Sequence, residues 1–249
     1  MRYAFAGDRD ISVQILDFLI NSGFKPEALF VSEEPTATHK DLLIKKANLE
    51  NRLVFVGNEF KNNLDLLNSL NLDYIIGIHF PYIIPIDVLN IPNVGVINLH
   101  PSYLPYNKGW HTASWAILDN SKLGATLHFM EETLDTGDII HQIELMPKLN
   151  DTADSLYKKV LELEYIVFKE AFNEIVSLKP KRVKQLEIGT SHSKKDLAKI
   201  QEIELYKKYS GLEILNRLRA LTTSNINEAS FFINENGEKV YITLNLVKD

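Results

Sequence analysis

Cysteine is missing from this sequence of 249 residues, and glycine and proline are scarce, with 11 and 9 copies. Without cysteine the chain has no disulfide framework, no zinc–thiolate site and no cysteine nucleophile. Hydrophobic residues make up 45% and charged residues 24%, which excludes a disordered or low-complexity chain. The composition therefore predicts a soluble globular protein with a sizeable core, in one large domain or one domain with a small appendage.

Long apolar runs and an excess of positive charge are missing as well. The most apolar stretch, residues 70–91, is interrupted by two prolines and two aspartates, so we do not expect it to span a membrane. The first ten residues are not typical of a signal peptide. A net charge of −6 argues against a surface built to bind nucleic acid or an anionic membrane. We expect neither partner, and we expect a cytoplasmic location, which the lack of cysteine permits.

Short apolar runs alternate with segments of helical periodicity through the first 180 residues. Uniformly apolar strands that alternate with helices indicate a parallel sheet covered on both faces. We therefore predict an α/β fold with a Rossmann-like, mostly parallel sheet. The expected strands are Tyr3–Ala6, Ala28–Val31, Leu53–Val56, Tyr74–Ile78, Val94–Leu99, Gly124–Met130 and Asp138–Leu145. The expected helices are Ser12–Leu19, His39–Ala47, Leu64–Leu70, Thr112–Leu118 and Ala153–Leu178, the last one ended by Pro180.

The last seventy residues differ in character, so we predict a catalytic domain over residues 1–180 and a small helical and β-hairpin region over residues 181–249. Residues 181–219 contain ten Lys or Arg and five Asp or Glu, a local charge of +5. From Phe231, two runs rich in β-branched and aromatic residues flank Asn236-Gly237, the strongest short hairpin signal. Because an exposed pair of strands needs a partner surface, the hairpin either joins a homodimer or packs on its own chain.

Residues suited to chemistry are concentrated between positions 96 and 142. Asn98 and His100 are two residues apart at the end of a predicted strand, so they face the same side of the sheet edge where α/β folds bind ligands. An amide beside an imidazole can polarise a carbonyl and stabilise an oxyanion. Asp135 lies in a turn and could reach back to orient His100. With no Ser or Cys nucleophile and no metal-ligand set, this group indicates direct attack by the substrate.

Taken singly, such a histidine is more often a packed residue, and Asp-Thr-Gly-Asp is ordinary turn chemistry. Four motifs in order outweigh that interpretation: Asn-x-His-Pro, Leu-Pro-x-x-x-Gly, Gly-x-Thr-x-His and Asp-Thr-Gly-Asp. From about residue 73 to residue 142 the sequence resembles the N10-formyltetrahydrofolate-dependent formyltransferases. The resemblance implies that Asn98, His100 and Asp135 are catalytic and that N10-formyltetrahydrofolate is the co-substrate.

The same resemblance implies where a folate would bind. The loop before the Asn-x-His strand would offer backbone and apolar groups to a flat pterin, and residues 131–135 would close over its other side. The residues implied are Phe80, Tyr82, Ile83, Ile84, Glu131, Thr133 and Asp135. By itself, the apolar loop is equally consistent with a strand-to-helix connection packed on the core.

Residues 107–115 are most similar to the sugar-nucleotide branch of this family, and their Gly-Trp-His pattern resembles enzymes that formylate dTDP-4-amino-4,6-dideoxyglucose. The resemblance implies formylation of the 4-amino group of this dTDP-sugar, for the O-antigen of lipopolysaccharide. Trp110 would face the deoxysugar, whereas Trp115 is expected to be a packing residue. Basic residues could meet the diphosphate, although most charge runs are solvated faces. The expected substrate-binding residues are Arg9, Lys108, Trp110, His111, Tyr209, Arg219 and Asn225.

Other functions stay open on the sequence alone. A 3-amino sugar nucleotide or methionyl-tRNA could accept the formyl group, although the acidic chain argues against tRNA. The folate site could instead serve the hydrolysis of formyltetrahydrofolate. The chain could also bind folate or nucleotide without catalysis. The intact Asn98, His100 and Asp135 set disfavours these last two functions.

Overall fold

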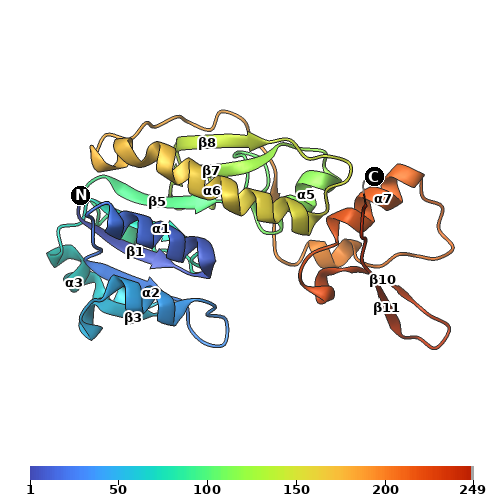
Figure 1. Cartoon of the computed structure of the whole chain (residues 1–249), viewed down its shortest axis with the longest axis horizontal. Coiled ribbons are helices and arrows are strands. Elements are labelled where there is room, and N and C mark those ends of the chain that lie inside the picture. Colours follow the sequence, from blue (N-terminus) through green and yellow to red (C-terminus); the bar gives the residue numbers. More distant parts are fainter. Residues whose placement is uncertain (248–249) are drawn as a thin grey trace. The chain divides into compact units, whose positions relative to one another are not determined.

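The computed structural model describes residues 1–247, which form two compact units (Figure 1). The first unit comprises residues 1–100, 126–142 and 164–186. The second comprises residues 101–125 and 143–163 and the C-terminal part of the chain from Glu187 onward. Each unit is therefore assembled from three separate segments of the sequence.

A seven-stranded sheet in the order β3-β2-β1-β4-β5-β7-β8 organises the first unit. Neighbouring strands from β3 to β5 pair in parallel, and β7 joins β5 antiparallel. This confirms the predicted mostly parallel α/β sheet. The strand order reverses between β1 and β4, and such a switch point directs ligands to the carboxyl ends of the strands. The strands are β1 (Tyr3–Gly7), β2 (Ala28–Val31), β3 (Val54–Val56), β4 (Tyr74–Ile78), β5 (Gly95–His100), β7 (Leu123–Phe129) and β8 (Ile139–Leu145).

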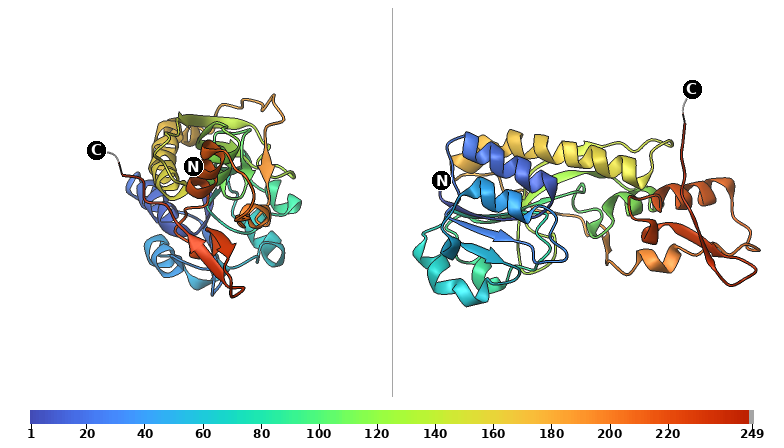
Figure 2. Two further views of the ribbon diagram at one scale, coloured as in Figure 1. Left: turned by 90° about the vertical axis from the view of Figure 1, so that its right-hand side faces the viewer. Right: turned by 60° about the horizontal axis from the view of Figure 1, so that its bottom comes forward.

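Helices cover both faces of this sheet. Leu67 of α3 packs in one apolar cluster with Ala4 of β1, so α3 covers the face of the sheet on which Ala4 lies. Tyr3 of β1 points to the other side and is fully buried there. Figure 2 (right) shows α1 and α6 together on one side of the strands and α3 on the other, and Phe18 of α1 contacts Phe168 of α6 edge-on. The helices are α1 (Arg9–Asn21), α2 (Lys40–Ala47), α3 (Leu64–Ser69), α4 (Ile86–Leu89) and α6 (Ala153–Val176).

The second unit has a core of its own. Ala116 of α5 and Leu156 of α6 pack with Ala220 of α7 in one buried cluster. Helix α7 begins with a reciprocal capping box between Ser210 and Glu213. Strands β10 and β11 pair antiparallel, which confirms the predicted hairpin. The elements of this unit are α5 (Thr112–Leu118), α7 (Gly211–Ala220), β6 (Lys108–Gly109), β9 (Ser191–His192), β10 (Ser230–Ile233) and β11 (Lys239–Ile242). Short 3₁₀ turns over the chain are Asn51–Leu53, Lys61–Asn63, Leu197–Ile200 and Ile226–Glu228.

The division into units differs from the boundary predicted at residue 180. That boundary grouped residues 101–125 and 143–163 with the sheet, but apolar side chains of these segments pack with α7. Helix α6 also ends earlier than expected, at Val176, because the chain turns out of the helix at Leu178, which has a φ of 58°. None of the helices in residues 1–247 combines the length and apolarity that a membrane span requires.

Candidate active site

The carboxyl end of β5 carries Asn98 and His100, and the neighbouring strand β7 adds a third polar side chain beside them. In the antiparallel register, His128 of β7 lies directly opposite Asn98, and Thr126 lies opposite His100. Residues that are directly opposed share one face of a sheet. The Asn98 amide accordingly donates a hydrogen bond from Nδ2 to Nε2 of His128, at 3.3 Å.

The second nitrogen of His128 determines which tautomer the ring adopts. Nδ1 lies 2.7 Å from the carbonyl oxygen of Phe129, and a carbonyl can only accept, so the proton is on Nδ1. Burial lowers the pKa of His128 to about 4, and the nearby Asp135 carboxylate opposes this shift only in part. His128 is therefore neutral near pH 7. Its bond to Asn98 orients the amide and uses one of the two N–H groups of Nδ2.

The carboxylate of Asp135 lies between the two imidazoles. Its Oδ2 is 3.7 Å from Nε2 of His100, and its Oδ1 is 3.6 Å from Nε2 of His128. Asp135 and His100 are 8% and 6% exposed. The imidazole rings of His100 and His128 meet edge-to-face. These separations exceed a direct hydrogen bond but give a substantial electrostatic interaction in a buried setting. The structure thus brings together the three residues of the predicted centre.

Asp135 belongs to a tight loop between β7 and β8. The residue adopts a φ of 54°, which non-glycine residues rarely do. Gly137 is required for close approach, because a Cβ at this position would lie 2.0 Å from the carbonyl oxygen of Phe129. Glu131 and Thr133, two of the expected folate contacts, are exposed in the same loop.

The loop after β4 contains the other expected folate contacts. Ile83 is 81% exposed, whereas Ile84 is buried in the core cluster of the first unit. The hydroxyl of Tyr82 accepts a hydrogen bond from the backbone N–H of Glu33, at 3.1 Å. Phe80 packs edge-on against a core phenylalanine. The side chain of Ile83 is thus the most accessible, those of Phe80 and Tyr82 are half-buried, and Ile84 could meet a ligand only through its backbone.

A second histidine–carboxylate pair begins this loop and was missed in the sequence analysis. Nε2 of His79 lies 2.9 Å from both carboxylate oxygens of Glu164, which is 0% exposed. Glu164 occupies the buried stripe of α6, four residues after Val160 and four before Phe168. An ionisable residue in such a stripe is the signal that could have revealed it. His128 had a clearer signal, since it was part of the quoted Gly-x-Thr-x-His motif.

The expected sugar-nucleotide contacts are divided between the units, with Arg9 in the first and the others in the second. Trp110 is 45% exposed, and the ammonium group of Lys194 lies 5.1 Å from the ring centre. His111 precedes α5 with a φ of 57°, and its Nδ1 is 3.8 Å from Glu228. Nζ of Lys108 donates to the carbonyl of Ile188 at 3.0 Å.

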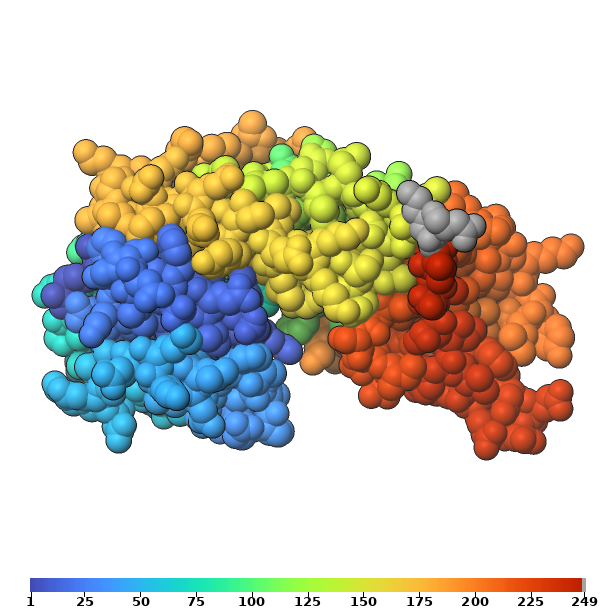
Figure 3. All heavy atoms as spheres, viewed as in Figure 1, coloured from blue at the N-terminus to red at the C-terminus, as the bar shows by residue number. Residues whose placement is uncertain are grey.

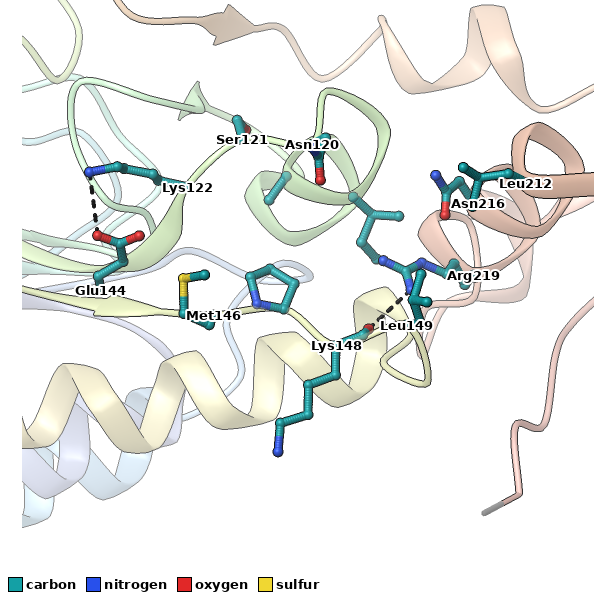
Figure 4. Close-up of a pocket in the computed structure, with 13 residues that line it drawn as sticks. Asn120, Ser121, Lys122, Glu144, Met146, Lys148, Leu149, Leu212, Asn216 and Arg219 are labelled. Atoms are coloured by element: carbon teal, nitrogen blue, oxygen red, sulfur yellow. Dashed lines mark hydrogen bonds and ion pairs between the residues drawn. The ribbon is translucent and has the colours of Figure 1, made fainter. Parts of the chain in front are cut away.

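The other three expected contacts of the second unit also have partners inside it. Arg219 is only 5% exposed and donates to the carbonyl of Lys148 at 3.0 Å, at the wall of a cavity of about 570 Å³ (Figure 4). The hydroxyl of Tyr209 accepts from the backbone of Glu204, and Oδ1 of Asn225 caps the turn that follows it. Arg219 thus has one internal partner through its guanidinium and also lines this cavity.

No metal centre is apparent in the described part of the chain. Within residues 1–247, no group of three or more His, Asp or Glu side chains is arranged to hold a metal ion.

Two protein families match this chain, one over its larger N-terminal part and one over its C-terminal region. The family described as formyl transferase matches residues 27–172, and the N-formyltransferase dimerization C-terminal domain matches residues 196–248. The chain is similar to the dTDP-4-amino-4,6-dideoxyglucose formyltransferase of Mycobacterium tuberculosis (strain ATCC 25618 / H37Rv), with 32% identity over 152 residues. That alignment covers 61% of this chain and 64% of the relative, so the chain spans less than two thirds of the relative's length.

Two solved structures are also similar. A 4-N formyltransferase from Francisella tularensis superimposes with a TM-score of 0.85 and 27% identity, over 100% of this chain and 98% of that chain. A formyltransferase from Anoxybacillus kamchatkensis, solved in complex with UDP-4,6-dideoxy-4-formamido-L-AltNAc and tetrahydrofolate, has a TM-score of 0.58 and 26% identity. This second likeness covers 85% of this chain and 93% of that chain.

Proposed function

The chain belongs to the formyl transferase family, and we propose that it moves a formyl group from N10-formyltetrahydrofolate to an amino group of a nucleotide-linked sugar. The observation that carries the proposal is the convergence of Asn98, His100 and Asp135 at the carboxyl end of β5. The names of the mycobacterial and Francisella relatives favour a 4-amino sugar, and the Anoxybacillus complex supports a folate donor. We take dTDP-4-amino-4,6-dideoxyglucose, a precursor for O-antigen, as the acceptor.

The first catalytic task is to stabilise negative charge on the formyl oxygen. The second N–H of the Asn98 amide is available for this, because the first is held by His128. The His100 imidazole, on the same face, supplies the other donor. The folate substrate supplies the formyl group. As the neutral sugar amine adds to the formyl carbon, these two side chains stabilise the charge that develops on oxygen.

The second task is proton movement. The new C–N bond to the sugar forms while the bond between the formyl carbon and N10 of the folate breaks, and one proton passes from the amine to N10. The Asp135 carboxylate, 3.7 Å from His100, stabilises positive charge on that ring and faces the reacting groups. We assign Asp135 to the routing of this proton, directly or through a water molecule.

Recognition of the donor and the acceptor falls to separate loops. We assign the folate to the loop 79–85, through Ile83, Tyr82 and backbone groups, and to the exposed side chains of Glu131 and Thr133. We assign the sugar nucleotide to Trp110, His111 and Lys108, which all belong to the second unit. Trp110 fits this role because almost half of its surface is exposed, whereas Trp115 stacks on His192 within its unit.

We also propose that the C-terminal region joins two copies of the chain. This region matches the dimerization domain, and the hairpin β10–β11 forms a projecting surface of its unit (Figure 3, red). Its exposed apolar residues include Ile233, Val240 and Tyr241. Tyr206 is fully exposed and lines the same shallow hollow as Ile233. Apolar side chains gathered on a two-stranded hairpin are typical of a contact surface. Light scattering of the intact chain should give twice the mass of one chain, and a monomer at micromolar concentration would contradict the dimer.

The proposed activity is tested by incubating the chain with N10-formyltetrahydrofolate and a panel of amines: dTDP-linked 4-amino and 3-amino sugars, UDP-linked 4-amino sugars and methionyl-tRNA. We expect a formamide product with the dTDP-linked 4-amino sugar and the highest kcat/KM for it. A formamide product with another amine would support formyl transfer but would contradict the proposed acceptor. Formate release without any amine would favour hydrolysis. Tight binding of folate without turnover of any amine would reject catalysis.

A further inference from the structure

The segment 180–186 crosses the edge of the first unit, and one of its residues points inward. In this fully described stretch, Val183 forms a bridge with Ile139 through two backbone hydrogen bonds of 2.8 and 2.9 Å. The residues from Lys181 to Ile188 are all exposed except Gln185, and Leu186 beside it is 91% exposed. A polar side chain that turns inward from an exposed strap calls for a partner, and the structure supplies one.

Gln185 contacts the loop that carries Asp135. Its Nε2 donates to the carbonyl oxygen of Asp135 at 3.0 Å and to that of Gly137 at 2.8 Å. The two N–H groups of the amide thus hold the backbone on both sides of Thr136. They act on a residue whose φ of 54° is unfavourable for a side chain with a Cβ.

The loop therefore has two kinds of restraint. Its base is held by the backbone bond from Phe129 to Asp138, at 2.9 Å, and by the close approach of Gly137 to Phe129. Its centre, where Asp135 is located, is held by the side chain of Gln185. A carboxylate that must stay within 4 Å of two imidazoles tolerates little movement, because a misplacement of about 1 Å can cost about a hundredfold in rate.

We infer that Gln185 is a positioning residue for the proposed reaction: it fixes the backbone of Asp135 so that the carboxylate faces His100. The inference rests on the proposed function. It predicts an effect on kcat, because Gln185 acts through the backbone of Asp135. KM for the sugar nucleotide should change by less than about twofold, whereas KM for the folate can rise as kcat falls, because Glu131 and Thr133 belong to the same loop.

The test compares two glutamines whose side-chain amides each donate to two backbone carbonyl oxygens, one at the Asp135 loop and one remote from it. Gln201, in the second unit, also donates from Nε2 to two carbonyls, those of Asn227 at 2.7 Å and Ala229 at 3.1 Å. Methionine has a similar length and no amide, so Gln185→Met and Gln201→Met remove equivalent contacts. Gln185→Glu is a second variant, because an ionised carboxylate cannot donate to carbonyl oxygens.

For each variant we would measure kcat, both KM values and amide hydrogen exchange in the peptide that covers residues 131–138. We expect kcat of Gln185→Met and Gln185→Glu to fall by about tenfold to a hundredfold with faster exchange in that peptide. Gln201→Met should keep kcat within about twofold of the original chain and exchange unchanged at 131–138.

Unchanged kcat in both Gln185 variants would overturn the inference, and so would a lower kcat with unchanged exchange at 131–138. An unaltered chain that transfers no formyl group to any amine would instead overturn the proposed function. The exchange measurement would then still decide whether Gln185 holds the loop.

Discussion

Two neighbouring strand ends in the first unit each present a histidine to a carboxylate, and they differ in geometry. After β4, Nε2 of His79 lies 2.9 Å from both oxygens of Glu164. At the end of β5, Nε2 of His100 lies 3.7 Å from Asp135. The two pairs are equally buried, since all four side chains are less than one tenth exposed. They differ in the distance between histidine and carboxylate and in the element that carries the carboxylate.

The two carboxylates are held in different ways. Glu164 is anchored on a long helix, and both of its oxygens are taken by one ring, so the pair fastens α6 to the loop after β4. Asp135 is carried by a tight turn, and it faces His100 and His128 at distances beyond a hydrogen bond. Asp135 therefore interacts electrostatically with two different rings, whereas Glu164 pairs with one.

The largest expected effect is at the end of β5. Replacing His100 with Asn removes the imidazole that Asp135 faces, and we expect kcat for formyl transfer to fall by roughly 10²–10⁴-fold. The melting temperature should change little, because Asn can remain in the strand. Steady-state kinetics of the purified variant measure this. A kcat within threefold of the original would remove His100 from the mechanism.

The pair at the end of β4 should respond in the opposite way. Glu164→Leu removes the partner of a buried histidine, and we expect the free energy of unfolding to fall by about 3 kcal/mol. Loss of kcat in the folded fraction should be less than tenfold. Urea denaturation followed by circular dichroism gives the first quantity. If this variant keeps its stability and loses activity as His100→Asn does, the distinction between the two pairs fails.

The pH dependence of stability sharpens the view of the β5 cluster. The pKa of His128 is lowered from 6.5 to about 4, so the unfolded chain binds a proton more readily than the folded chain between these values. The contribution of the neutral His128 to the free energy of unfolding is about 3 kcal/mol. It is complete above about pH 6.5 and is lost as the pH falls toward 4.

Replacing His128 with Gln should therefore flatten the stability curve between pH 4 and 6.5, as judged by urea midpoints at each pH. The matched control is His141→Gln in β8, where the ring is a third exposed and pairs with Glu170. A stability curve of His128→Gln that runs parallel to that of the original chain would contradict a buried, neutral imidazole.

The smallest expected effect concerns the acceptor. Trp110→Ala removes the exposed aromatic face that we assign to the sugar, and we expect KM for the dTDP-sugar to rise by about fivefold, with kcat within twofold. Trp115→Ala is the control, because its stacking on His192 is internal and its loss should lower the melting temperature without raising KM. An unchanged KM for Trp110→Ala would place the sugar elsewhere.

Much of this molecule was predictable from patterns along the chain. The buried strands appear as apolar runs, and the β5 motif places Asn98 and His100 on one face by the two-residue period of a strand. The hairpin follows from Asn236-Gly237 between apolar runs. The discontinuous units were not predictable, because membership depends on which segments pack together and not on sequence distance.

Single positions show the same limit. Arg219 was predicted to meet a diphosphate, since a basic residue in a basic stretch resembles a solvated cation until its burial is known. His128 and Glu164 were overlooked as partners, since Asn98 meets the first through antiparallel pairing and His79 meets the second 85 residues along the chain.

The order of residues is enough to give the kinds of chemical group available, most of the strands and helices that carry them, and the side of β5 from which Asn98 and His100 project. These properties depend on local geometry and on the spacing of apolar residues. The folded arrangement alone sets the carboxylate distances, the neutral state of His128 and the contact of Gln185 with the Asp135 loop. Those depend on burial and on side chains that meet across strands and loops, which no pattern along the chain encodes.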